Sequence, residues 1–224
     1  MNEALLNVVA ANAAFVGSHF LMSHPLRAAM VKPLGDMGFQ VVYSLVSIAT
    51  LAWVYFAFTS APAADLPGTG DIGWILATIL TLPAMVLFAG SVSGNPALGL
   101  PGSENMARAE PKGVFRVTRH PMMWGFALWA LSHIVLYWSM RTMITAFAMG
   151  FLALVGAHMQ DRKKEVLMGD AWETWESHTS YWPRLGAIFQ VGALPWVVGL
   201  VLFAFFSWLH LPLGGIAAGI WRWF

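Results

Sequence analysis

Two of the seven histidines in this sequence, His19 and His133, lie inside long apolar stretches. An ionisable side chain in membrane hydrocarbon is costly unless it has a partner, so such residues are usually functional. Two imidazoles on different helices can ligate a haem iron from its two sides, while apolar and aromatic neighbours receive the porphyrin and exclude water. The residue types and their setting therefore predict that His19 and His133 bind haem iron.

Helical spacing gives each of these histidines an apolar face of its own: Phe15 and Met22 flank His19, and Trp129 and Leu136 flank His133. Trp129 is accordingly predicted to contact the cofactor. The alternative is that each ring is neutral and bonds a nearby backbone carbonyl or serine, since three serines are close in sequence: Ser18, Ser23 and Ser132. The residues alone leave both interpretations open.

The two histidines are predicted to lie at different depths, about 10 Å apart at 1.5 Å of helix rise per residue. His120 matches the depth of His19 more closely and is therefore the reserve ligand. Arg119 and Arg116 fall on the same side as His19, where they are suited to pair with haem propionates. The other histidines are predicted to be weaker candidates or interfacial and loop residues: His24, His158, His178 and His210.

Six apolar runs are long enough to cross about 30 Å of hydrocarbon: 4–22, 38–58, 72–92, 121–140, 142–159 and 192–211. The composition agrees, with 58% hydrophobic and only 10% charged residues. We therefore expect an all-α, polytopic transmembrane helix bundle of about six spans, forming a single domain over residues 1–224. The segment 212–224, with its two tryptophans and an arginine, is predicted to be an interfacial tail rather than a seventh span.

Ten of the twelve basic residues fall in alternate loops, the first, third and fifth: Arg27, Lys32, Arg108, Lys112, Arg116, Arg119, Arg162, Lys163, Lys164 and Arg184. Because lysine and arginine are retained on the cytoplasmic side, these loops are expected to be cytoplasmic and both termini outside. A bacterial inner membrane is the expected location. The run 162–164 is predicted chiefly to set topology and to touch anionic membrane lipid.

The composition excludes several other classes of protein. The sequence has no cysteine, which removes disulfides, thiolate nucleophiles and thiolate ligands from consideration. The formal net charge of +1 gives no indication of a nucleic-acid partner.

Several motifs carry a resemblance to a known family. The segment 119–125 (RHPMMWG) continues into Leu128–His133, and two earlier segments, 16–19 (VGSH) and 43–47 (YSLVS), belong to the same pattern. Later matches are Asp161-Arg162, 169–172 (GDAW), 179–183 (TSYWP) and 187–189 (AIF). Together they resemble the NnrU family, to which the 15-cis-ζ-carotene isomerases also belong, over roughly residues 15–190.

This resemblance implies a membrane-bound haem b protein whose redox-dependent iron isomerises the central 15-15′ cis double bond of a linear carotene. The family's two haem-ligating histidines fall on His19 and His133, and an electron donor of unknown identity is implied. Two departures from the family pattern bear on the function. Residues 134–138 lack the Gly-Asn type of turn common in the family, and Ala130 stands where the plant isomerases have a cysteine, which removes exchange of a thiolate ligand. Other bacterial members are associated with denitrification and nitric oxide, which gives a second functional expectation.

A competing class shares part of this pattern. Arg119-His120-Pro121, followed by Glu165, Trp172 and Trp175, also resembles the small membrane methyltransferases of the isoprenylcysteine and phospholipid type, which hold S-adenosylmethionine at the cytoplasmic surface. A third alternative is a non-catalytic haem or metal chaperone for denitrification enzymes. It would need the same two histidines but no substrate site.

Overall fold

The structure is a computed structural model that describes residues 2–224. Those residues form helices and connecting loops without a strand, which confirms the all-α fold class. The long helices are α1 (Glu3–Ser23), α2 (Arg27–Ser60), α3 (Gly70–Ser91), α5 (Pro121–Leu136), α6 (Met140–Met168) and α8 (Ala193–Gly214). The short ones are η1 (Pro96–Leu98), α4 (Ser103–Ala107), η2 (Gly113–Arg116), α7 (Asp170–His178), η3 (Leu185–Gln190) and η4 (Gly219–Arg222).

Five of the long helices are long and apolar enough to cross a membrane, whereas α5 has only 16 residues. The run predicted at 121–140 ends early because Tyr137 adopts a left-handed conformation, with a φ of 46°. Ser139 then caps α6, its hydroxyl accepting a hydrogen bond from the amide of Thr142. The helix α2 includes residues of the predicted first loop, but Gly35, whose φ is 69°, is not helical and separates them from the predicted second span. The fifth run, predicted at 142–159, is longer than expected, because α6 continues to Met168.

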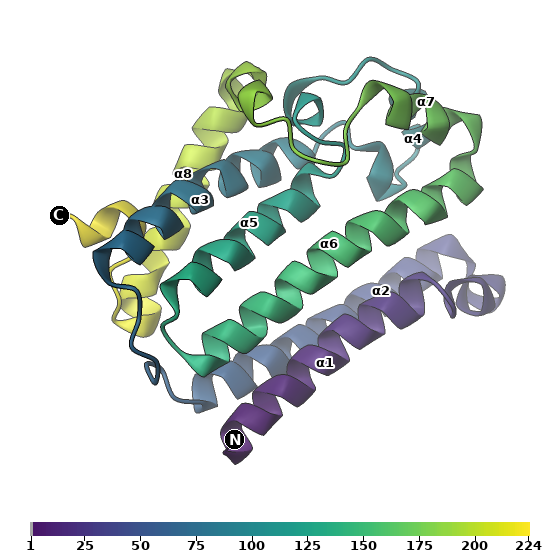
Figure 1. Cartoon of the computed structure of the whole chain (residues 1–224). Coiled ribbons are helices and arrows are strands. Elements are labelled where there is room, and N and C mark those ends of the chain that lie inside the picture. The colour runs from purple at the N-terminus through teal and green to yellow at the C-terminus, as the bar shows by residue number, and fades with distance from the viewer. Residues whose placement is uncertain (1) are drawn as a thin grey trace.

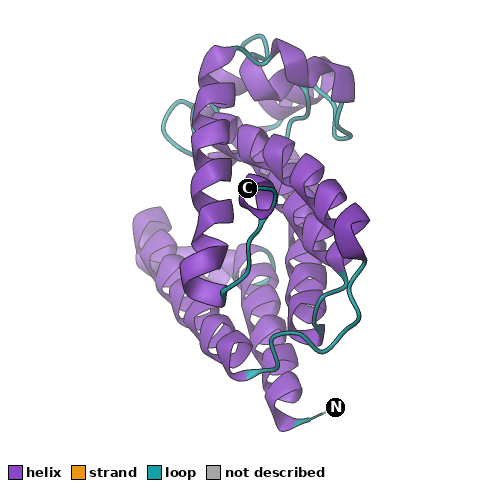
Figure 2. Ribbon diagram, turned by 90° about the vertical axis from the view of Figure 1, so that its left-hand side faces the viewer, coloured by secondary structure: helices purple, strands orange, loops and turns teal. Residues whose placement is uncertain are grey.

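The long helices form two layers (Figures 1 and 2). In the first layer α1 packs on α6, α6 on α5, and α5 on α3. In the second layer α2 packs on α1 and α8 packs on α3, so that both lie behind the first layer in Figure 1. Glycines allow the closest approaches: a Cβ at Gly125 would lie 2.9 Å from the carbonyl oxygen of Ala84, and one at Gly199 would lie 2.8 Å from the Cα of Val86.

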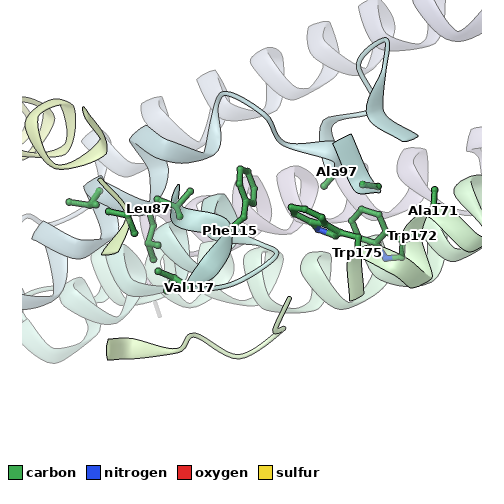
Figure 3. Close-up of a cluster of buried hydrophobic side chains, with 11 residues drawn as sticks. Leu87, Ala97, Phe115, Val117, Ala171, Trp172 and Trp175 are labelled. Atoms are coloured by element: carbon green, nitrogen blue, oxygen red, sulfur yellow. The ribbon is translucent and has the colours of Figure 1, made fainter. Parts of the chain in front are cut away.

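Residues 92–120 and 169–192, which we call the cap, cover one end of these layers (Figure 1). There α4 packs on α7 and η2 on η3. The interior of the cap is an apolar cluster built around Phe115, Trp172 and Trp175 (Figure 3). A bond from His24 Nε2 to the carbonyl oxygen of Met159, 3.3 Å long, brings the α1–α2 turn to this same end. The first, third and fifth loops therefore share one end; the membrane side they face stays a prediction.

The C-terminal segment lies at the opposite end from the cap. The helix α8 continues to Gly214, and η4 then folds back onto α8 and the start of α3. Trp221 donates its indole N–H to the carbonyl oxygen of Ala204 at 2.9 Å, and the Arg222 guanidinium lies over the Trp74 ring at 4.5 Å. This segment forms no seventh span, as predicted.

Candidate functional site

His19 is held by its own helix. Its Nδ1 lies 2.7 Å from the carbonyl oxygen of Phe15, one turn earlier, and the two ring centroids are 4.3 Å apart. Because a carbonyl can only accept, Nδ1 carries the proton, and in the neutral ring Nε2 keeps its lone pair. The nearest polar group to Nε2 is the Ser47 hydroxyl of α2 at 3.4 Å, beside the ring of Tyr43.

His133 has the same local arrangement on α5. Its Nδ1 lies 2.8 Å from the carbonyl oxygen of Trp129, whose ring centroid is 4.4 Å from the imidazole. The Ser132 hydroxyl is 3.1 Å from this same Nδ1 and not from Nε2. The second neighbour is His210 of α8, whose ring is stacked at a centroid distance of 6.2 Å. The alternative that a nearby serine or carbonyl is the partner of His133 therefore holds for Nδ1. No serine in the described part of the chain lies within hydrogen-bond distance of Nε2.

Contacts along α6 give the height of His19. Midway along α1, the Asn12 side-chain amide lies 3.3 Å from the Thr145 hydroxyl of α6. Beyond its end, His24 reaches the carbonyl oxygen of Met159. The two helices therefore run parallel, and His19, between these two contacts, lies level with residues near 153 of α6.

Measured along α6 in the same way, His133 lies further from the cap than His19. A Cβ at Gly150 of α6 would lie 3.3 Å from the Cβ of Ala130, so His133, nearly one turn further along the antiparallel α5, lies level with residues near 147. The two histidines thus differ in height by about 9 Å at 1.5 Å per residue, close to the separation expected from the sequence. They flank α6 on either side, and their binding of one iron together stays a prediction.

Both imidazoles nevertheless lie on one face of the first layer. The ring of His19 contacts α2, and the ring of His133 contacts α8. These are the two helices of the second layer, which lie on the same side in both views (Figures 1 and 2). The sequence predicted only the depth of these residues in the membrane. The two layers also show that both imidazole rings face the second layer.

A different arrangement surrounds the reserve ligand, His120. The Asp161 carboxylate of α6 accepts from His120 Nε2 at 2.7 Å and from Arg119 Nε and Nη2 at 3.0 and 2.7 Å. Arg119 also pairs with Glu176 of α7 at 3.0 Å. We call Arg119, His120, Asp161 and Glu176 the polar cluster. Both carboxylates pair with Arg119, and Asp161 holds Nε2 of His120, whose buried Nδ1 has no hydrogen-bond partner among residues 2–224. The pairing of Arg119 with a haem propionate and the role of His120 as the reserve ligand stay predictions.

The polar cluster joins α5 and α6 to the cap. Thr118 donates its hydroxyl to the carbonyl oxygen of Tyr181 at 2.8 Å and accepts from the amide of His120 at 3.2 Å. Trp124 donates its indole N–H to the same Tyr181 carbonyl at 2.9 Å. The Arg119 guanidinium lies over the Tyr181 ring at 5.6 Å. Sequence reasoning missed these roles of Asp161 and Glu176, although a carboxylate directly after an apolar run was a usable signal.

The remaining predicted residues have simpler settings. Arg116 is exposed and donates to the carbonyl oxygen of Pro111 at 3.4 Å. His158 and His178 are exposed, and no cluster of three or more metal-ligating His, Asp or Glu side chains occurs among residues 2–224. His19 and His133 each donate Nδ1–H to a carbonyl, as metal-bound histidines commonly do, and their ligation of iron stays a prediction.

Comparison with known proteins agrees with the motifs. The family model described as NnrU protein matches residues 7–218. The chain is 35% identical over 80 residues to the chloroplastic 15-cis-zeta-carotene isomerase of Arabidopsis thaliana, and 34% identical over 73 residues to that of Zea mays. These segments cover 35% and 32% of this chain but only 21% and 19% of the plant proteins, about a fifth of their length. No solved structure matches.

Proposed function

Since the chain belongs to the NnrU family, we propose that it is a membrane haem b protein that catalyses cis–trans isomerisation of a linear carotene. The observation that carries the proposal is the shared geometry of His19 and His133. Each Nδ1 is bonded to a backbone carbonyl, each Nε2 is left without a strong partner, and both rings lie on one face of the first layer. The similarity to two plant carotene isomerases supports the choice of substrate class.

The residues have distinct roles in this proposal. Phe15 and Trp129 fix the orientation of the imidazole rings through their carbonyls and through aromatic contacts of 4.3 and 4.4 Å. Second-shell bonds of this kind hold the tautomer in which Nε2 is free to ligate a metal. The apolar helices exclude water and suit a polyene. Bound haem would supply redox-active iron beside one double bond of the polyene, so that the bond can rotate without transfer of a group.

The cofactor is tested by the absorption spectrum of the purified full-length protein from cells supplied with haem. We expect a Soret band that falls at least about tenfold in His19→Ala and in His133→Ala, because each change removes one of the two side chains that would hold the haem. His158→Ala is the matched control, since this exposed histidine lies on α6 outside the site. A colourless wild-type protein, or a band that only His120→Ala removes, would contradict the ligand assignment.

The reaction is tested separately. The chain is coexpressed with desaturases that accumulate the tri-cis carotene, and the 15-cis isomer is followed by chromatography in the dark. Its loss with wild type but not with His133→Ala supports isomerisation. A pigmented, reduced protein that converts no carotene would exclude the isomerase and favour the alternative of a denitrification or nitric-oxide-related haem protein.

The methyltransferase alternative has weaker support. It requires Arg119 and His120 to contact S-adenosylmethionine, but both side chains are bonded to Asp161. Binding of the cofactor there would break a buried ion pair, at a cost of about 3–5 kcal/mol. Equilibrium dialysis with labelled S-adenosylmethionine tests it directly, and no binding is expected.

A further inference from the structure

Lys164, near the end of α6, is a buried cation with little to neutralise it. Only 6% of the residue is exposed. Its Nζ makes one long contact, 3.4 Å to the carbonyl oxygen of Pro96, and no carboxylate among residues 2–224 lies within ion-pair distance of it. A buried ammonium normally has an anionic partner, because the loss of its hydration is otherwise uncompensated.

The surroundings add positive charge. Lys163 and Arg27 are close enough to act on Lys164 electrostatically. One acidic residue of the cap, Glu104, lines a pocket beside Lys164, but its side chain is exposed and makes no ion pair with the ammonium. The local excess of positive charge therefore attracts an anion from outside the protein.

A pocket of about 360 Å³ opens beside this ammonium. It is lined by Lys164 and Met168 of α6 and by the segment 99–105 of the cap, apart from Pro101. Gly99 has a φ of 70°, and a Cβ there would lie 3.3 Å from Lys164 Nζ, so the glycine leaves the ammonium accessible from the pocket. Gln160, one turn earlier on α6, donates to the carbonyl oxygen of Ala97 at 3.1 Å and holds this loop against the helix.

We propose that this pocket binds a phosphate group, with Lys164 as its charged ligand. A lysine ammonium is a compact point charge with three donors, which suits phosphate oxygens. The pocket lies where the apolar part of α6 passes into the cap. A phospholipid headgroup and a soluble phosphate are two sources of the same chemistry. The proposal is independent of haem and of carotene.

The experiment measures thermal unfolding of the purified full-length protein in a neutral detergent that contains no phosphate. Inorganic phosphate is added at constant ionic strength. For a chain of this size, a phosphate concentration about tenfold above Kd should raise Tm by about 3–5 °C. We expect this rise in the wild type and in Lys112→Met, which alters an exposed lysine of the cap, but not in Lys164→Met.

A second arm separates the two sources. Phosphatidylglycerol is compared with a diacylglycerol that has the same acyl chains and no phosphate. A Tm rise with phosphatidylglycerol alone identifies a lipid headgroup, and a rise with inorganic phosphate identifies a soluble ligand. No rise with either, or an equal rise in Lys164→Met, would overturn the proposal.

Two further readouts guard against a folding defect. Without phosphate, Lys164→Met should unfold no earlier than the wild type, because it removes an uncompensated buried charge. If that variant is not recovered, Lys164→Gln takes its place, since its amide removes the charge and keeps hydrogen-bond donors on a side chain of similar shape. It should bind phosphate several-fold more weakly; unchanged affinity would count against the pocket.

Discussion

Buried histidines are bonded differently in the apolar helices and in the cap. Within the apolar helices, His19 and His133 bond a backbone carbonyl through Nδ1 and leave Nε2 without a strong partner. In the cap, His120, which directly precedes α5, bonds the Asp161 carboxylate of α6 through Nε2. The comparison teaches that a buried histidine can be oriented by a carbonyl of its own helix, which fixes one ring, or by a carboxylate of a neighbouring helix, which also ties two elements together.

The largest effect is expected from Asp161→Asn, which breaks the polar cluster at its centre. The change leaves Arg119 with only Glu176 and leaves His120 without its carboxylate. Loss of one partner of a buried ion pair costs about 3–5 kcal/mol, so Tm should fall by roughly 10 °C in detergent.

Asp36→Asn is the control for this change. Asp36 pairs with Arg27 at 3.1 Å, but its side chain is 71% exposed. Exposed pairs contribute about 0–1 kcal/mol, so Tm should hardly change. Equal effects of the two substitutions would contradict the structural importance of the polar cluster.

His120→Ala should have the next largest effect on stability. It removes a buried hydrogen bond to a charged group and leaves a cavity, at a cost of about 2–3 kcal/mol. Absorption spectra recorded beside the unfolding curves should show the haem band unchanged per folded protein. A bleached but stable variant would show that His120 belongs with the ligands, and the comparison would fail.

Glu176→Gln should cost about 0.5 kcal/mol or less. Partial burial raises the pKa of Glu176, an effect that the nearby Arg119 opposes. Arg119 also keeps its two bonds to Asp161. A Tm loss as large as that of Asp161→Asn would mean that the cap, and not α6, carries the cluster.

Ser47→Ala is expected to have almost no effect on Tm or on the haem absorption band. The hydroxyl already donates to the carbonyl oxygen of Tyr43 at 2.8 Å, and its 3.4 Å separation from His19 Nε2 is long for a hydrogen bond. A fall of more than about 1 kcal/mol in the free energy of unfolding would indicate that serine, not iron, is the partner of His19.

Much of the fold could be predicted from the sequence, because a membrane span is specified by the length of one apolar run. Three spans deviate from the predicted bounds. The helix α6 continues through polar residues to Met168, past the predicted end at 159, and the other two deviate at single residues. A left-handed Tyr137 ends α5 early, and a non-helical Gly35 separates the predicted second span from a short helical stretch in the predicted loop. Neither conformation is encoded in hydropathy.

The candidate site was predictable only in part. The sequence identified His19 and His133 because an imidazole is conspicuous in an apolar run, and spacing placed an aromatic ring beside each. It could not predict that Asp161, 41 residues after His120, would face it, since that contact depends on the register between α5 and α6. For the same reason the stacking of His133 on His210 could not be foreseen.

The brevity of α5 has a consequence for the lipid around it. Sixteen residues span about 24 Å, less than the roughly 30 Å of an average hydrocarbon layer. The turn after Leu136, together with Arg141, is therefore drawn toward the acyl chains unless the bilayer is compressed locally. This hydrophobic mismatch favours thin membranes, and short-chain lipids should stabilise the protein more than long-chain ones.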